Sequence, residues 1–223
     1  MTPRRVTIVE VGPRDGLQNE QALVSTADKI EFVNRLSAAH LPVIEVSAFV
    51  SPKWVPQMTD AAAVFAGITR SPGTRYTALV PNLSGLDHAV AAGVTEIAIF
   101  ASSTETFSRK NINQSIDDSL TAYKTVCDRA IAAGLRVRGY LSTAFGCPFE
   151  GAVAPQQVAT VAGRLADLGV FEVAVSDTIG IAHPGQVPAV LEAVLARVPV
   201  ERVALDPCEK SHPMKLTLLP FLC

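Results

Sequence analysis

Short apolar, β-branched runs alternate along the chain with longer segments of helical periodicity. The pattern predicts seven strands, at residues 6–11, 43–49, 76–80, 96–100, 136–142, 171–175 and 202–205. It predicts six helices between them, at residues 26–39, 57–66, 84–92, 115–133, 155–168 and 184–196. Capping residues or proline stand near several helix starts and glycine follows several helix ends, as expected for real helices. Strands that alternate with helices predict βαβ units and a parallel sheet.

The number of strands separates two architectures. An open doubly wound sheet usually has five or six strands, whereas a (β/α)₈ barrel has eight strand–helix pairs in about 250 residues. The pattern therefore predicts an α/β fold, a TIM (β/α)₈-type barrel that is incomplete at the C-terminus. Residues 1–205 are predicted to form one partial barrel domain, and residues 206–223 an atypical tail. This tail has three prolines in 18 residues and no helical period. We interpret it as a truncated or frame-shifted end, with a genuine irregular tail as the alternative.

Composition narrows the class of partner. The net charge is −2 and the pI is about 6.1, and no basic stripe is present, which argues against nucleic acid. Four cysteines without a CxxC pair do not indicate a disulfide framework, so we expect reduced thiols in a cytoplasmic protein. The N-terminus lacks the apolar core of a secretory signal. No apolar run approaches the roughly 20 residues of a membrane helix, so no membrane partner is predicted.

Polar residues gather where the predicted strands end. Arg14 and Asp15 follow the first strand, Glu45 lies within the second, and Asp177 follows the sixth. Ligands of parallel α/β folds bind at the carboxyl ends of strands. The loops at the opposite ends, such as those at Gly93 and Gly169, are short and carry little chemistry. This asymmetry predicts an enzyme.

Each of these residues also has a structural interpretation. Arg14 and Asp15 form either a self-satisfied turn or a site for an anionic ligand, with the carboxylate where a hard cation would bind. Glu45 lies in an apolar strand and needs a partner, either in a site or in an ion pair with Arg14 or Arg138. Asp177 either caps the next turn or acts in the site.

The fifth strand and its neighbouring loops supply further candidates. Arg138 is either a substrate ligand or an ion-pair partner inside the sheet. The segment FSRKNIN, at 107–113, is predicted to be a loop whose basic residues are either solvated or together hold a phosphorylated ligand. Cys147 is either a site residue or a small buried hydrophobe. No histidine has metal-ligand spacing to another.

Five segments carry a resemblance to a known family. These are VGPRDGLQNE, IEVSAFVSPKWVPQM, ALVPNLSGLDHAVAAGVTEIAIFASSTETFSRKNIN, VRGYLSTAFGCPFEG and VSDTIGIAHP. They closely resemble 3-hydroxy-3-methylglutaryl-CoA lyases, from about Val6 to Leu205. Isopropylmalate, citramalate and homocitrate synthases share the R-D-G-x-Q pattern, but not SPKWVPQ or GCPFEG.

The resemblance implies a TIM-barrel lyase that cleaves 3-hydroxy-3-methylglutaryl-CoA to acetyl-CoA and acetoacetate with Mg²⁺ or Mn²⁺, as expected in leucine degradation. By the family pattern Asp15 is a metal ligand, Arg14 stabilises the enolate, and Glu45 and Asp177 are active-site acids. Cys147 matches a family cysteine near the site. We further predict a CoA thioester as substrate, a possible homo-oligomer, and substrate-binding roles for Arg14, Arg138, Tyr140, Ser142, Lys110 and Asn111.

The sequence departs from the family near residue 205. The family reads VALHFHD with two histidine metal ligands, and this chain reads VALDPCE, with Asp206 and Cys208 in their places. The family's later glycine-rich loop, which carries a catalytic cysteine and a ligand asparagine, is not found in the sequence. We therefore expect an incomplete metal site, little lyase activity, and association through open sheet edges. The alternatives are a condensing synthase of the isopropylmalate or citramalate synthase type, and a non-catalytic paralogue that binds CoA esters.

Overall fold

The structure is a computed structural model that describes residues 6–207. Its strands are β1 (Val9–Glu10), β2 (Val43–Ala48), β3 (Arg75–Leu79), β4 (Glu96–Ser102), β5 (Arg136–Ser142), β6 (Glu172–Ser176) and β7 (Val203–Asp206). Its α-helices are α1 (Thr26–Ala38), α2 (Ala61–Gly67), α3 (Leu83–Ala91), α4 (Glu105–Ile112), α5 (Ile116–Ala132), α6 (Pro155–Asp167) and α7 (Val187–Leu195). The described residues also form three short helical turns, η1 (Gly12–Gly16), η2 (Pro56–Met58) and η3 (Val200–Arg202).

The described strands form one sheet in chain order, β1-β2-β3-β4-β5-β6-β7. The pairs β1–β2, β2–β3, β3–β4, β5–β6 and β6–β7 are parallel. Parallel neighbours require a crossover segment, and each crossover here contains at least one helix. The predicted βαβ organisation is therefore confirmed.

Three predicted elements were wrong in detail. The strand predicted at 6–11 is shorter in the structure, where β1 spans only Val9–Glu10. The segment 107–113 was expected to be a loop, but most of it belongs to α4, so the described residues contain seven α-helices rather than six. This helix is polar, and an ion pair between Arg109 and Glu105 at 3.6 Å supports it in place of an apolar stripe. The helix predicted at 57–66 is divided into η2 and α2.

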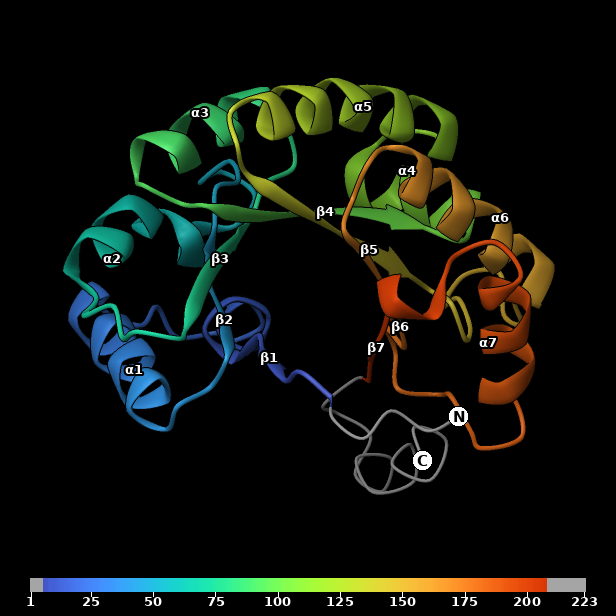
Figure 1. The fold of residues 1–223 in the computed structure, drawn as a ribbon, viewed down its shortest axis with the longest axis horizontal. Helices are drawn as coiled ribbons and strands as arrows, with labels where there is room; N and C mark the ends of the chain where they lie inside the picture. Colours follow the sequence, from blue (N-terminus) through green and yellow to red (C-terminus); the bar gives the residue numbers. More distant parts are fainter. Residues whose placement is uncertain (1–5, 208–223) are drawn as a thin grey trace. The chain divides into compact units, whose positions relative to one another are not determined.

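By contacts the chain divides into two compact units, which we describe separately. The first contains residues 5–99 and 129–136. In it α1 and α2 pack together and both contact β2 (Figure 1). The core is formed by side chains such as Val33, Ile44 and Val64, which are fully buried, and by Phe49 stacked on Phe65. Every residue of β2 is buried, as expected for a strand covered on both faces.

The second unit contains residues 100–128 and 137 onward. Here α6 and α7 pack together, and α6 contacts β6 (Figure 1). Leu165 on α6 and Val190 on α7 are fully buried. The prediction of one domain at 1–205 stays a prediction, and residues 208–223 of the predicted tail lie outside the described residues. None of the described helices combines the length and apolar character needed to cross a bilayer.

Replacing either of two helical glycines by alanine is expected to change the stability of the protein in opposite directions. A Cβ at Gly85, in the first turn of α3, would collide with the backbone carbonyl oxygen of Phe49, whereas a Cβ at Gly163 in α6 would lie 3.5 Å from Arg197. Gly85→Ala is therefore expected to lower the free energy of unfolding by about 1–3 kcal/mol. Gly163→Ala is expected to raise it by about 0.5–1 kcal/mol, because alanine favours the helix. Urea melts of both variants measure the free energy of unfolding. Equal changes in the two variants would contradict the packing described for Gly85.

A buried carboxylate marks the amino ends of the strands. Glu96, the first residue of β4, is 2% exposed and accepts ion pairs from Arg75 at 3.4 Å and Arg136 at 3.3 Å. These arginines are the first residues of β3 and β5. Because ligands of parallel folds bind at the opposite ends of the strands, we assign this cluster to stability.

The two described cysteines are buried free thiols, Cys127 and Cys147. Burial, followed by the neighbouring Asp128 carboxylate, raises the pKa of Cys127 to about 12. A thiol with this pKa stays protonated at neutral pH and packs as a small apolar group. Cys127 is therefore a core residue.

Candidate active site

A short π-helical turn, η1, carries the first two candidates directly after β1. Pro13 lies at its start, and the main-chain N–H groups of Arg14 and Asp15 both donate to the Val11 carbonyl, at 3.1 and 2.7 Å. The turn reverses the chain within five residues and leaves the Arg14 side chain 11% exposed. The interpretation of this segment as a turn is therefore correct as far as its backbone is concerned.

The Arg14 guanidinium bridges two carboxylates. Its Nε donates to Glu45 Oε1 at 2.5 Å, and its Nη1 donates to Asp15 Oδ1 at 2.7 Å. Glu45 comes from the middle of β2, and its side chain is 1% exposed. The prediction that Glu45 needs a partner is confirmed, and that partner is Arg14. The pair holds the guanidinium in a nearly water-free position, where its electrostatic interactions are weakly screened.

Asp15 differs from Glu45 in its exposure. Its side chain is 55% exposed, while its main-chain carbonyl accepts a hydrogen bond from the Asn19 amide at 2.8 Å. Within residues 6–207 no group of three or more His, Cys, Asp or Glu side chains is arranged to hold a metal ion. Cys208, one of the residues expected in place of a family histidine, lies outside the described residues. The described side chains thus offer Asp15 as a candidate ligand but do not form a complete metal site.

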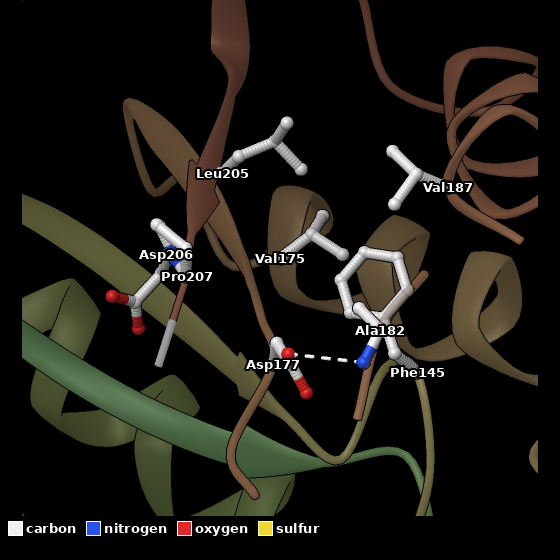
Figure 2. Close-up of a pocket in the computed structure, with 8 residues that line it drawn as sticks. All are labelled: Phe145, Val175, Asp177, Ala182, Val187, Leu205, Asp206 and Pro207. Atoms are coloured by element: carbon white, nitrogen blue, oxygen red, sulfur yellow. Dashed lines mark hydrogen bonds between the residues drawn. The ribbon is translucent and has the colours of Figure 1, made fainter. Parts of the chain in front are cut away.

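Asp177, directly after β6, has a buried carboxylate that is 3% exposed. Its two oxygens accept hydrogen bonds from the main-chain N–H groups of Ile181 and Ala182, both at 3.1 Å. Figure 2 shows the bond to Ala182 beside the Phe145 ring, in a pocket that Val187 also lines. The interpretation of Asp177 as a cap of the following turn is therefore confirmed. A carboxylate has about four acceptor sites, so this capping does not exhaust it.

Arg138 forms an ion pair inside the second unit. Its Nη1 lies 2.8 Å from Glu172 Oε1, the residue opposite it in the parallel β5–β6 register. The guanidinium carbon lies 5.4 Å from the centre of the buried Tyr140 ring. The alternative of an ion pair within the sheet is correct for Arg138. The substrate-binding roles of Arg138 and Tyr140 stay predictions.

Buried hydroxyl groups surround the Cys147 thiol. Thr104 donates to Cys147 Sγ at 3.1 Å, and Thr143 Oγ1 lies 3.0 Å from Ser102 Oγ. Thr143 has a φ of 59°, which is strained for a β-branched residue. Its main-chain N–H donates to Thr178 Oγ1 at 2.7 Å, which fixes the residue after Asp177 to the end of β5. Strain of this kind costs about 1–3 kcal/mol and is concentrated at functional sites.

The remaining candidates lie on α4 and at the end of β5. Asn111 and Ser142 line the same small hollow, together with the buried Ser108. Lys110 is exposed, and its Nζ lies 3.9 Å from the centre of the Phe149 ring. The structure therefore brings together two of the predicted substrate contacts, and places Lys110 on an aromatic ring in the same unit.

The candidates of the first unit form one group, whereas those of the second unit include two neighbouring pairs. Arg14, Asp15 and Glu45 are in direct contact in the first unit. Arg138 with Tyr140 and Asn111 with Ser142 are neighbours in the second, which also contains Asp177. Sequence reasoning did not single out Gln57, a buried residue of η2. A glutamine between the apolar Val55 and Met58, in a segment otherwise typical of a surface loop, was the available signal.

Comparison with known proteins identifies the family to which this chain belongs. A family model described as HMGL-like matches residues 5–207. The chain belongs to the HMGL-like family. The cytoplasmic 3-hydroxy-3-methylglutaryl-CoA lyase of Rattus norvegicus is 52% identical over 203 residues, which are 91% of this chain and 59% of that protein. A 3-hydroxy-3-isohexenylglutaryl-CoA/hydroxy-methylglutaryl-CoA lyase of Pseudomonas aeruginosa is 52% identical over 202 residues, or 91% of this chain and 67% of that protein.

Solved structures of HMGL-like proteins confirm the predicted fold. The hydroxymethylglutaryl-CoA lyase of Pseudomonas aeruginosa superposes with a TM-score of 0.96 at 48% identity, covering 99% of this chain and 74% of that one. An HMG-CoA lyase of Acinetobacter baumannii, solved with coenzyme A and 3-methylmalate, matches with a TM-score of 0.91 at 32% identity over 100% of this chain and 73% of that one. The TIM-barrel type is therefore correct. The chain spans about three fifths of the length of the curated relatives it matches first.

Proposed function

We propose that the protein is a lyase that cleaves 3-hydroxy-3-methylglutaryl-CoA to acetyl-CoA and acetoacetate. The observation that carries the proposal is the buried Arg14–Glu45 pair at the strand ends of a chain about 50% identical to such lyases. The relatives' names support cleavage rather than the condensing synthase alternative.

The reaction requires charge to be stabilised as one carbon–carbon bond breaks. The tertiary hydroxyl loses its proton, its oxygen becomes the ketone of acetoacetate, and the bonding pair moves onto the thioester fragment as an enolate. Protonation of that enolate gives acetyl-CoA. A fixed guanidinium lowers the energy of the enolate without reorganisation during the step, which is the role we propose for Arg14. Glu45 would orient Arg14, and Asp177 would transfer a proton.

A divalent cation, Mg²⁺ or Mn²⁺, remains part of the proposal. When bound, such an ion lowers the pKa of a coordinated substrate hydroxyl and orients it. Asp15 is the candidate ligand, since its carboxylate is half exposed. Because the described residues do not complete a metal site, we assign no step to the ion.

The substrate class follows from the same relatives. The Acinetobacter baumannii lyase structure contains coenzyme A, and Lys110 and Asn111 are the proposed contacts of a CoA thioester in this chain. Arg138, Tyr140 and Ser142 are proposed to contact the acyl part. A cytoplasmic location remains a proposal, because relatives are named both cytoplasmic and mitochondrial. A homo-oligomer is likewise a proposal.

The decisive experiment follows both products. Incubating the purified chain with 3-hydroxy-3-methylglutaryl-CoA and Mg²⁺ is expected to release acetoacetate and acetyl-CoA in equal amounts, at a low rate because the described residues do not complete a metal site, and EDTA is expected to slow the release further. Condensation of acetyl-CoA with a 2-oxo acid, without cleavage, would support the synthase alternative. Calorimetric binding of CoA without turnover would support the non-catalytic alternative. Either result would overturn the proposed lyase.

A further inference from the structure

The segment SPKWVPQM, residues 51–58, has no role in the proposed reaction, although it is among the most specific motifs of the sequence. Residues 51–54 are exposed, whereas the last two side chains, Gln57 and Met58, are only 4% and 2% exposed. These two belong to η2, the short turn that follows β2. Their contacts show what the segment supports.

Gln57 uses its side-chain amide on the segment that follows Arg14 and Asp15. Its Nε2 donates to the carbonyls of Ala22 at 3.0 Å and Leu17 at 3.3 Å, and its Oε1 accepts from the Val24 N–H at 3.0 Å. A primary amide has two N–H donors, and both are used here. Leu17 is the residue directly after η1, and its own N–H bonds back to the carbonyls of Gly12 and Arg14. Gln57 therefore holds the chain at the exit of the turn that carries Arg14.

A buried lysine holds Gln57 in turn. Lys29, 6% exposed, donates from Nζ to the Gln57 main-chain carbonyl at 2.5 Å and pairs with Asp60 Oδ1 at 2.7 Å. The other oxygen of Asp60 accepts a hydrogen bond from Thr26 at 2.7 Å. Burying a lysine is costly unless it is paired and hydrogen-bonded, so this arrangement fixes the Gln57 backbone to the first turns of α1.

Met58 connects the same turn to the strand that carries Glu45. Its Sδ accepts a hydrogen bond from Ser47 at 3.3 Å, and Ser47 lies two residues after Glu45 on β2. Gln57 and Met58 thus contact the two elements that carry the ion pair. Gln57 bonds at the exit of the turn that carries Arg14, and Met58 bonds to the strand that carries Glu45. All of these residues lie within the first unit.

We propose that Gln57 is a positioning residue, which sets the Arg14 guanidinium against Glu45 by holding the exit of the η1 turn. Its catalytic consequence rests on the proposed lyase function, but its geometric consequence does not. The competing explanation is ordinary loop packing, in which the loss of Gln57 lowers stability and leaves the Arg14–Glu45 hydrogen bond as it was.

The test compares Gln57→Leu with Ser37→Ala. Leucine removes all three side-chain hydrogen bonds of Gln57 at similar size. Ser37 is a matched control because it is 2% exposed, lies in the same unit, and bonds to Val33 and Tyr76. Two readouts need no activity, namely the NMR signal of the Arg14 Nε–H and the hydrogen exchange of the Arg14 and Asp15 amides. In Gln57→Leu the signal is expected to shift or broaden and both amides to exchange at least about tenfold faster, whereas Ser37→Ala changes neither.

Turnover separates this proposal from the lyase proposal. If the wild-type chain cleaves the substrate, Gln57→Leu is expected to lower kcat by about 10–100-fold, with KM nearly unchanged, because small displacements of a catalytic group are that costly. If the wild-type chain does not cleave it, the lyase proposal fails while the exchange and NMR results still decide this one. An unchanged Arg14 signal and unchanged exchange, with stability lowered as in Ser37→Ala, would overturn it. Gln57→Glu, which keeps an acceptor and loses both donors, gives the same readouts should the leucine variant not fold.

Discussion

Replacing Arg14 by glutamine is expected to lower kcat for cleavage of 3-hydroxy-3-methylglutaryl-CoA by about 10²–10³-fold, the usual cost of removing one preorganised donor to a developing oxyanion. The guanidinium is 11% exposed and bridges Glu45 and Asp15, so water cannot readily replace its charge at that point. Steady-state kinetics with acetoacetate as the measured product tests this. A kcat within threefold of the wild-type value would rule out the proposed role of Arg14 in stabilising the enolate.

The same substitution is also expected to lower the free energy of unfolding by about 3–5 kcal/mol, because Glu45 then stays buried without its guanidinium partner. The double variant Arg14→Gln, Glu45→Gln is the matched control. It is expected to recover most of the stability, since two neutral amides replace the broken ion pair, but to leave kcat low. Denaturant melts of both variants and the wild type give the comparison. Recovery of kcat in the double variant would show that the first loss arose from misfolding rather than from the missing charge.

Asp177→Asn is expected to affect both a turn and the reaction. One of the two carboxylate oxygens becomes an NH₂ group facing a main-chain N–H of Ile181 or Ala182, which costs about 1–3 kcal/mol for the unsatisfied donors. Loss of a general acid–base group lowers kcat by about 10²–10⁴-fold. Hydrogen exchange at Ile181 and Ala182 measures the first effect, and kcat measures the second.

The two effects of this substitution distinguish the roles of Asp177. Asn82→Ala is the control, since Asn82 also caps through its side chain, accepting from Gly85 N–H at 2.9 Å at the start of α3. That variant is expected to lose stability and keep its kcat. If Asp177→Asn likewise speeds exchange but keeps its kcat, Asp177 is a capping residue alone and its proposed part in proton transfer is wrong.

Strand β5 and helix α4 show where sequence reasoning succeeds and where it fails. The predicted strand 136–142 coincides with β5, because its β-branched and apolar residues are bounded by Gly134 and a polar turn. Helix α4 was missed because it has no apolar stripe. Its ion pair between Glu105 and Arg109, and its end at Asn113 in the left-handed conformation, are visible only in three dimensions.

In the candidate site, too, the sequence predicted some features and only the structure showed others. That Glu45 requires a partner follows from its position in an apolar run, since an unpaired carboxylate cannot be buried there. The choice of Arg14 over Arg138 could not be made from the sequence, because both arginines lie near strands and their reach depends on sheet register. In the structure Arg138 pairs with Glu172, directly opposite it in the register, and Arg14 reaches Glu45 through the tight η1 turn.

The sequence by itself determined the α/β class, the order of the strands and the strand ends at which charged residues collect, because periodicity and residue type are local properties. Only the tertiary structure decided which charges meet, and that Gln57 bonds to Leu17 after the Arg14 turn while Lys29 bonds to Gln57. Those contacts join residues that are 28 to 40 positions apart in the chain. They form where η2 meets α1 and the segment that follows η1, and no local pattern encodes such packing.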